Sequence, residues 1–143
     1  MTITKLQDET VLLLKQLIET PSLSRQEDQT GRLLFDFLEK SRIEVRRFKN
    51  NIYARSKNWQ ADKPVLLLNS HHDTVKAAKG WQRDAFKATR EGEQLFGLGS
   101  NDAGASLVGL MAAFRYFYDK QLPVNLIFAA SAEEEISGPN GIA

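Results

Sequence analysis

The chain of 143 residues carries 19 Lys and Arg against 18 Asp and Glu, a net charge of +1, and contains no cysteine. This length corresponds to one domain, and the 42% share of apolar residues supports a packed core, which argues against intrinsic disorder. A charge this close to zero gives no sign of a polyanionic partner, and the lack of cysteine excludes disulfides, thiol nucleophiles and zinc fingers. A metal ion would therefore need histidine and carboxylate ligands.

The first part of the chain predicts two helices and a hairpin. Apolar residues at helical spacing predict a helix over 3–19. The run Ser24 to Glu27 has the Ser-x-x-Glu form of a capping box, which satisfies two free amides at a helix start, and predicts a second helix to about Ser41. Alternating apolar and charged residues around the turn signal Asn50-Asn51 then predict an antiparallel hairpin.

The second part of the chain predicts a βαβ unit. The unbroken apolar run 65–69 is typical of a strand buried on both faces. Two short strands are expected around 86–89 and 94–96, followed by a helix over 103–120 and a strand over 124–130. Such a unit is right-handed, and the whole pattern predicts an α/β fold with helices packed on a mainly parallel sheet.

The sequence gives no sign of a membrane or nucleic-acid partner. No apolar run approaches the roughly 18 residues of a membrane span, and the N-terminus does not resemble a signal peptide, so a soluble cytoplasmic protein is expected. The basic residues Arg42, Arg46, Arg47 and Lys49 interleave with Glu44, which favours a solvated strand face over a nucleic-acid interface.

Reactive side chains follow the two buried strands of the βαβ unit. His71-His72-Asp73 comes after the first strand, Asp102 precedes the helix, and Glu133-Glu134-Glu135 comes after the second strand. Ligands of open α/β sheets bind beyond the carboxyl ends of parallel strands. Taken singly, an acidic run is typical of a solvated face and an acidic residue of an ordinary helix start. Their joint arrangement at one end of the sheet indicates a site.

The spacing of these residues suggests how they divide the chemistry. In extended chain, residues i and i+2 share a face, so Asp73 can orient His71 as a metal ligand while His72 points away. Glu134 and Glu135, as neighbours in extended chain, would face opposite ways, so that one can ligate and the other can move protons. Asp102, at a helix N-terminus, could bridge two ions. Histidine with carboxylates suits zinc, cobalt or manganese.

Four linked segments, Leu66–Val75, Trp81–Phe86, Leu95–Asp102 and Ala130–Gly138, resemble the metallopeptidase M20 family of dizinc exopeptidases and deacylases. The resemblance runs over essentially the whole chain. It implies a zinc exopeptidase-like catalytic domain, a three-layer αβα arrangement around a mainly parallel sheet. Within the family, the residues look most similar to acetylornithine deacetylase and its relatives acting on N-acyl-ornithine or N-acyl-citrulline compounds.

The resemblance also implies a role for each residue of the site. His71 matches a ligand of one metal, Asp102 the carboxylate that bridges both metals, and Glu135 a ligand of the second metal. Asp73 matches the carboxylate that supports the histidine, and Glu134 matches the general base. The implied cofactors are two divalent ions, zinc with cobalt as the alternative. The implied reaction is hydrolysis of the amide bond of a small N-acyl amino acid in arginine biosynthesis.

The chain departs from the family pattern in sequence and in length. Ala103-Gly104-Ala105 stands where the family usually has Met-Lys-Gly, and Glu133 stands where it commonly has Asp. Family enzymes also have a lid and dimerisation domain, and they take further ligands from later segments. We therefore expect residues 1–143 to be the truncated N-terminal part of a discontinuous catalytic domain. This part should be inactive alone and belong to a homodimer when complete.

Two other functions remain open at this point. A dipeptidase or aminopeptidase of the same family would use the same five residues, because the lid and later segments set substrate choice. A non-catalytic binding module could keep the fold without the metals, although every motif position present in the chain is intact.

Overall fold

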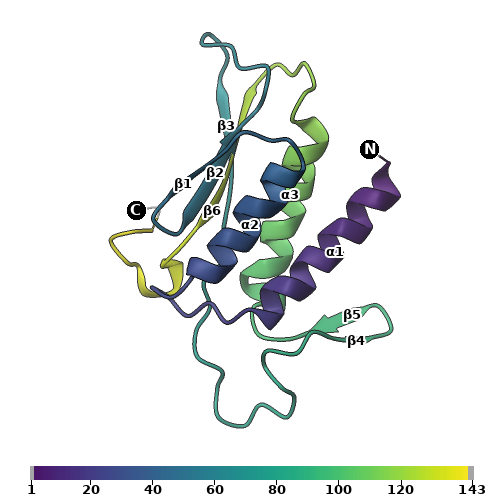
Figure 1. The fold of residues 1–143 in the computed structure, drawn as a ribbon, viewed down its shortest axis with the longest axis vertical. Coiled ribbons are helices and arrows are strands. Elements are labelled where there is room, and N and C mark those ends of the chain that lie inside the picture. The colour runs from purple at the N-terminus through teal and green to yellow at the C-terminus, as the bar shows by residue number, and fades with distance from the viewer. Residues whose placement is uncertain (1, 142–143) are drawn as a thin grey trace.

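Three helices lie against one face of a four-stranded sheet in the computed structural model, which describes residues 2–141 (Figure 1). The helices are α1 (Ile3–Glu19), α2 (Asp28–Lys40) and α3 (Ser106–Phe117). The sheet contains β1 (Val45–Phe48), β2 (Asn51–Arg55), β3 (Val65–His71) and β6 (Asn125–Ser131). A separate hairpin contains β4 (Thr89–Glu91) and β5 (Gln94–Phe96). Among the described residues, no helix combines the length and apolar character of a membrane span.

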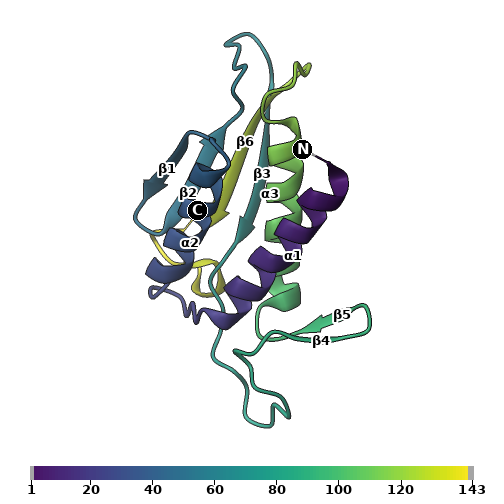
Figure 2. The ribbon, with the colours of Figure 1, turned by 45° about the vertical axis from the view of Figure 1, so that its right-hand side comes forward.

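The sheet is mixed, with the strand order β1-β2-β6-β3. β3 and β6 are parallel and are connected through α3, which confirms the βαβ unit. The β1–β2 hairpin joins β6 in the antiparallel sense, so the mainly parallel sheet expected from the sequence is not what residues 2–141 build. All three helices lie on the same face (Figure 2), so these residues form two layers of the expected three. The α/β class itself is confirmed.

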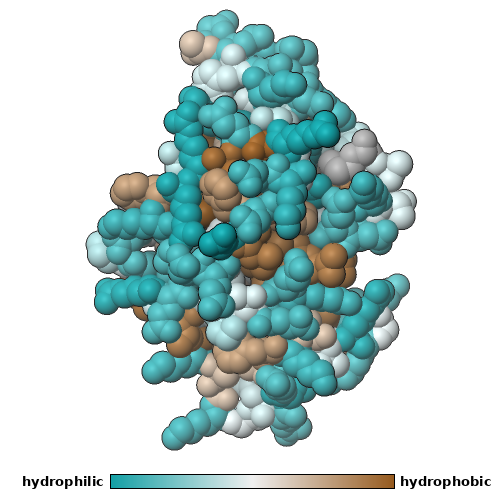
Figure 3. Space-filling model, in the orientation of Figure 1, coloured by the Kyte–Doolittle hydropathy of each residue, from teal (hydrophilic) through white to brown (hydrophobic). Residues whose placement is uncertain are grey.

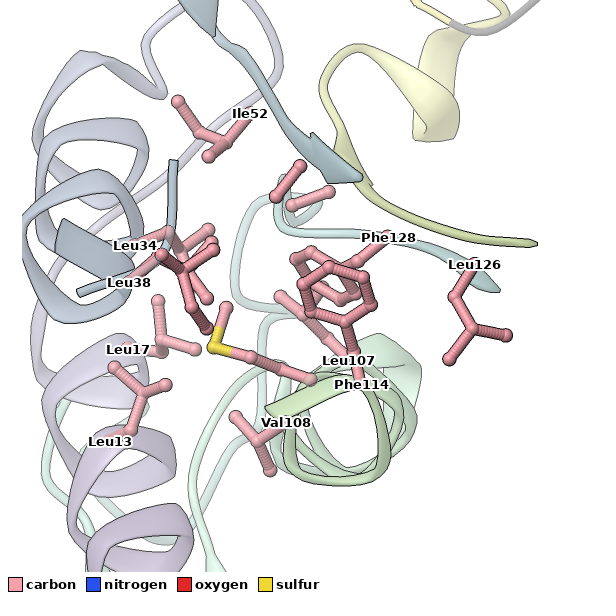
Figure 4. Packing of buried hydrophobic residues seen from close by; sticks show 14 residues of the cluster. Leu13, Leu17, Leu34, Leu38, Ile52, Leu107, Val108, Phe114, Leu126 and Phe128 are labelled. Atoms are coloured by element: carbon pink, nitrogen blue, oxygen red, sulfur yellow. The ribbon is translucent and has the colours of Figure 1, made fainter. Parts of the chain in front are cut away.

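The core lies between the three helices and the inward faces of β2 and β6 (Figure 4). Alternate residues of a strand point to the same face, which brings Ile52 of β2 together with Phe128 of β6. Leu34 of α2 and Phe114 of α3 pack against them, and the Phe114 and Phe128 rings lie 5.8 Å apart. This packing fixes the strands from which the candidate site residues extend.

Strand β3 is more exposed than its apolar sequence predicts. Val65, Leu66 and Leu67 keep 50%, 49% and 48% of their surface exposed. The expectation of a strand buried on both faces was wrong for these residues, because β3 is the outermost strand and its second face carries no helix among residues 2–141. On the helix side, apolar surface appears in patches between polar side chains (Figure 3).

Two helices begin later than the sequence indicates. α2 starts at Asp28, and the expected capping box does not cap it, because no side chain bonds to its free amides. α3 starts at Ser106, so Asp102 is not at its N-terminus. Asp102 instead has extended backbone (φ −107°, ψ 102°) within an irregular segment. That segment is closed by a 2.8 Å hydrogen bond from the Gly104 amide to the Gly99 carbonyl.

Candidate metal centre

The five residues singled out by sequence, His71, Asp73, Asp102, Glu134 and Glu135, lie at one end of the sheet. β3 and β6 are parallel and in register to their last residues, so the segments that follow them begin side by side. In Figure 1 this is the lower end, where the yellow segment after β6 lies near the start of α2. The expected convergence is therefore present.

Three of these residues form a group that could hold a metal ion. His71, Asp102 and Glu135 each offer a ligand atom, and these atoms lie within 4.8 Å of one another. The His71 Nε2 atom is 3.1 Å from Asp102 Oδ1. Two ligands of a single zinc ion lie at most about 4.4 Å apart. One imidazole and two carboxylates at this spacing suit a divalent cation. The three ligand atoms would have to move only slightly closer together for all of them to contact one ion.

Electrostatics of the group also favour a cation. Burial raises the pKa of Glu135, and the neighbouring Asp102 carboxylate adds to that effect. The Asp102 and Glu134 side chains are 75% and 53% exposed, so the carboxylates face solvent from which an ion can enter. A bound divalent ion would relieve the repulsion between these carboxylates.

Asp73 holds the His71 ring from the side opposite the ligand group. The His71 Nδ1 atom lies 3.1 Å from the Asp73 carbonyl oxygen and 3.4 Å from its carboxylate Oδ1 atom. Donation of the Nδ1 proton to Asp73 directs Nε2 toward Asp102 and Glu134, where it can bind a metal ion once its own proton has left. The expected pairing of residues i and i+2 is thus present.

The Asp73 carboxylate is 1% exposed and is surrounded by donors. Its Oδ2 atom accepts from Ser24 Oγ at 2.7 Å and from the Glu135 amide at 3.1 Å, and its Oδ1 atom accepts from the Glu134 amide at 3.1 Å. Burial alone would raise the pKa of Asp73. The hydrogen bonds from His71, Ser24 and the two amides outweigh burial and lower this pKa to about 2, so the group is ionised at neutral pH.

The same pairing makes His71 basic. Its hydrogen bond to Asp73, opposed by burial and assisted by Asp102, raises the pKa of His71 to about 9. Metal binding at Nε2 must therefore displace a proton at neutral pH. We expect the apparent metal affinity to rise about tenfold per pH unit from about pH 6 to about pH 8 and to level above pH 9. Calorimetry in buffers of different ionisation enthalpy should detect the released proton, and zero release at pH 7 would contradict this expectation.

The acidic turn, defined here as Glu133 to Glu135, is not extended as the sequence suggested. Glu133 has left-handed backbone (φ 56°, ψ 23°), and Glu134–Ile136 form one helical turn. Glu134 and Glu135 therefore do not face opposite ways. Glu134 Oε2 lies 3.6 Å from His71 Nε2, while Glu135 belongs to the ligand group. The reason is that the Asp73 carboxylate binds both of their amides and bends the chain.

His72 points away from the site, as expected. It is 5% exposed, its Nε2 atom donates to the Asn50 carbonyl at 2.9 Å, and its Nδ1 atom accepts from Thr30 Oγ1 at 2.9 Å. Burial lowers the pKa of His72, so the ring is neutral. His72 connects β3 to α2 and to the hairpin and is not available as a ligand.

Ser24 is the residue of the site whose place sequence reasoning missed. The sequence assigned it to a capping box, but its hydroxyl donates to Asp73, 49 positions further along the chain. Local sequence cannot distinguish a serine that caps a helix from one that binds a distant carboxylate, because both precede an amphipathic helix.

Two known enzymes are similar to the chain in sequence. The chain is 33% identical to acetylornithine deacetylase of Salmonella arizonae over 138 residues, which cover 86% of this chain and 35% of that protein. It is 26% identical to succinyl-diaminopimelate desuccinylase of Delftia acidovorans over 141 residues, which cover 92% of this chain and 36% of that protein. The chain therefore spans about a third of the length of these relatives.

Solved structures show the same fold. An M20 family metallo-carboxypeptidase from Sulfolobus solfataricus superposes with a TM-score of 0.76 and 27% identity, over 90% of this chain and 31% of that one. A dinuclear metal-binding peptidase of the M20 family from Bacillus subtilis has a TM-score of 0.69 and 20% identity, over 94% of this chain and 37% of that one.

The family model that matches the chain covers the whole candidate centre. It is described as peptidase family M20/M25/M40, and the match extends over residues 67–143, from β3 through the acidic turn. The resemblance seen in the sequence is confirmed, and the chain belongs to peptidase family M20/M25/M40, a family of hydrolases.

Proposed function

We propose that residues 1–143 are the N-terminal part of the catalytic domain of a metal-dependent deacylase, which hydrolyses the amide bond of an N-acyl amino acid. N-acetylornithine is the first candidate substrate, with a place in arginine biosynthesis. The observation that carries the proposal is the group of His71, Asp102 and Glu135 with the Glu134 carboxylate beside it. The similarity to acetylornithine deacetylase supports the choice of substrate.

The residues of the centre would hold two divalent ions, with zinc the first choice and cobalt the alternative. His71 would bind one ion, Glu135 the other, and Asp102 would bridge them. Bound ions would polarise the amide carbonyl and make a water molecule more acidic. This assignment gives each ion about two protein ligands, fewer than the three of catalytic zinc sites. We propose that segments of a longer protein supply the rest.

Glu134 acts as the general base in this proposal. Its carboxylate lies on the solvent side of the centre, with Oε2 3.6 Å from His71 Nε2. It takes a proton from the attacking water as the oxygen bonds to the carbonyl carbon. It then delivers that proton to the amine nitrogen as the carbon–nitrogen bond breaks. The products are a free amino acid and a short carboxylic acid. Asp73 keeps the His71 ring in its ligating orientation throughout.

The choice of substrate is tested with the intact protein, which here means a protein as long as the relatives that contains residues 1–143. Values of kcat/KM are compared for N-acetylornithine, N-succinyl-diaminopimelate and a dipeptide. We expect N-acetylornithine to give the highest value. A higher value for the dipeptide would favour the second candidate, a dipeptidase or aminopeptidase. Human carnosine dipeptidase 1 shares the fold, with a TM-score of 0.68 at 23% identity. No bound metal by elemental analysis, together with no hydrolysis of any of the three, would favour a non-catalytic binding module.

The 143-residue chain by itself should behave differently from the intact protein. We expect no measurable hydrolysis of N-acetylornithine and only weak zinc binding, because the proposed ligand set is incomplete. Calorimetry and an assay for released ornithine check this expectation. Tight binding of two zinc ions by the chain alone, or turnover of the substrate, would contradict it.

A further inference from the structure

Two buried carboxylates, Glu27 and Asp73, bind the backbone of the acidic turn. Its three successive amides all donate to them: the Glu133 amide binds Glu27 Oε1 at 3.1 Å, and the amides of Glu134 and Glu135 bind Asp73 at 3.1 Å each. Asp73 belongs to the centre already described. Glu27, the residue just before α2, is not one of the proposed ligands, and its side chain bonds to Arg25, Asn50 and Glu133.

Glu27 is an unusual residue to find in a protein interior. Its surface is 0% exposed, and burial of a carboxylate is costly unless hydrogen bonds compensate it. Compensation is present, since Oε1 also accepts from the Arg25 amide at 2.7 Å and Oε2 accepts from Asn50 Nδ2 at 2.8 Å. Each of these three partners is an N–H donor, so both oxygens of the Glu27 side chain act as acceptors.

The position of Glu27 is fixed relative to β3 as well. Its partner Asn50 accepts a hydrogen bond from His72, the neighbour of His71 in the chain. His72 in turn binds Thr30, one turn beyond Glu27 in α2. Through Asn50 and His72, the Glu27 carboxylate is connected to the end of β3, which carries His71. The same carboxylate binds the amide of Glu133 in the acidic turn.

The turn needs such support at Glu133. This residue has left-handed backbone, which is unfavourable for a residue other than glycine. The hydrogen bond from its amide to Glu27 helps to hold the conformation that brings Glu134 and Glu135 to the centre. Without this bond the turn can relax away from His71, although both glutamates remain in the chain.

We infer that Glu27 is a positioning residue of the metal centre, which acts through the Glu133 amide to place the carboxylates of Glu134 and Glu135. The inference rests on the proposed function for the roles of those two glutamates. Both end residues of the Ser-x-x-Glu run before α2 therefore support the site: Ser24 donates to Asp73, and Glu27 accepts from the acidic turn.

The test is Glu27→Gln in the intact, metal-loaded protein. The amide keeps the shape of the side chain, but it replaces one of the two accepting oxygens with an NH2 donor, so it cannot accept from all three N–H partners. We expect kcat to fall about tenfold or more with KM changed less than about threefold, as is typical for partners that orient metal ligands. The absorption spectrum of the cobalt-loaded variant should shift, and the amides of the acidic turn should exchange faster in the metal-free protein.

Two variants of the same helix separate positioning from stability. Glu39→Gln changes an exposed glutamate and should leave every readout unchanged. Leu38→Val removes buried volume and should lower the unfolding temperature, without affecting kcat or exchange in the turn. If the wild-type protein hydrolyses none of the substrates, the proposed function fails, while the exchange and cobalt readouts still test Glu27. Wild-type exchange in the acidic turn of Glu27→Gln, or a wild-type kcat where the wild-type protein is active, would overturn the inference.

Discussion

Glu134→Gln in the intact, metal-loaded protein is expected to lower kcat by at least about 100-fold, the usual contribution of a general base. The amide cannot take a proton from water at neutral pH, yet it has the size of the carboxylate it replaces. Metal content should remain at the wild-type level, because the proposed ligands are His71, Asp102 and Glu135. Steady-state kinetics and elemental analysis of the same preparation measure both quantities.

A matched variant shows whether the loss is specific. Glu93 is an exposed glutamate in the turn between β4 and β5 and is not one of the proposed ligands, so Glu93→Gln should keep the wild-type kcat. If Glu134→Gln also keeps the wild-type kcat with its metals bound, Glu134 is not the base. The proton would then have to be taken by another group.

Asp73→Asn is expected to weaken both metal binding and folding. The carboxylate accepts from Ser24 and from the amides of Glu134 and Glu135, and it orients His71. An amide cannot accept from all of these donors. We expect metal affinity to fall about 10- to 100-fold. We also expect the free energy of unfolding to fall by about 1–3 kcal/mol for each donor left unpaired.

Competition titration with a chelator and urea unfolding of the metal-free protein measure these two losses. Ser24→Ala is the matched control, because it removes one donor and keeps the carboxylate, so both effects should be smaller. Metal affinity in Asp73→Asn equal to that of the wild type would mean that the His71 ring is oriented by other contacts.

Much of the fold could be predicted because local patterns determine it. Apolar periodicity located α1 and α3, and the two apolar runs became the parallel pair β3 and β6. Parallel strands end at the same side of a sheet, so the meeting of His71, Asp102 and the acidic turn follows from topology. The pairing of His71 with Asp73 follows from the alternation of side chains along a strand.

Other features depend on contacts between distant residues, which no local pattern reveals. The acidic turn bends because Asp73 and Glu27 bind its amides across separations of at least 61 positions. The run Ser24 to Glu27 fits a capping box by sequence, but tertiary hydrogen bonds take up both side chains. The exposure of β3 reflects its place at the edge of the sheet, which the apolar run alone could not indicate.

The most direct test of the account is metal removal from the intact protein, since the central claim is that the strand-end residues hold the ions for amide hydrolysis. Metal content and N-acetylornithine hydrolysis are measured before chelation, after chelation and after zinc is restored. We predict two ions per chain, loss of hydrolysis with the ions and recovery with zinc. Undiminished hydrolysis by protein that retains no metal would contradict the account.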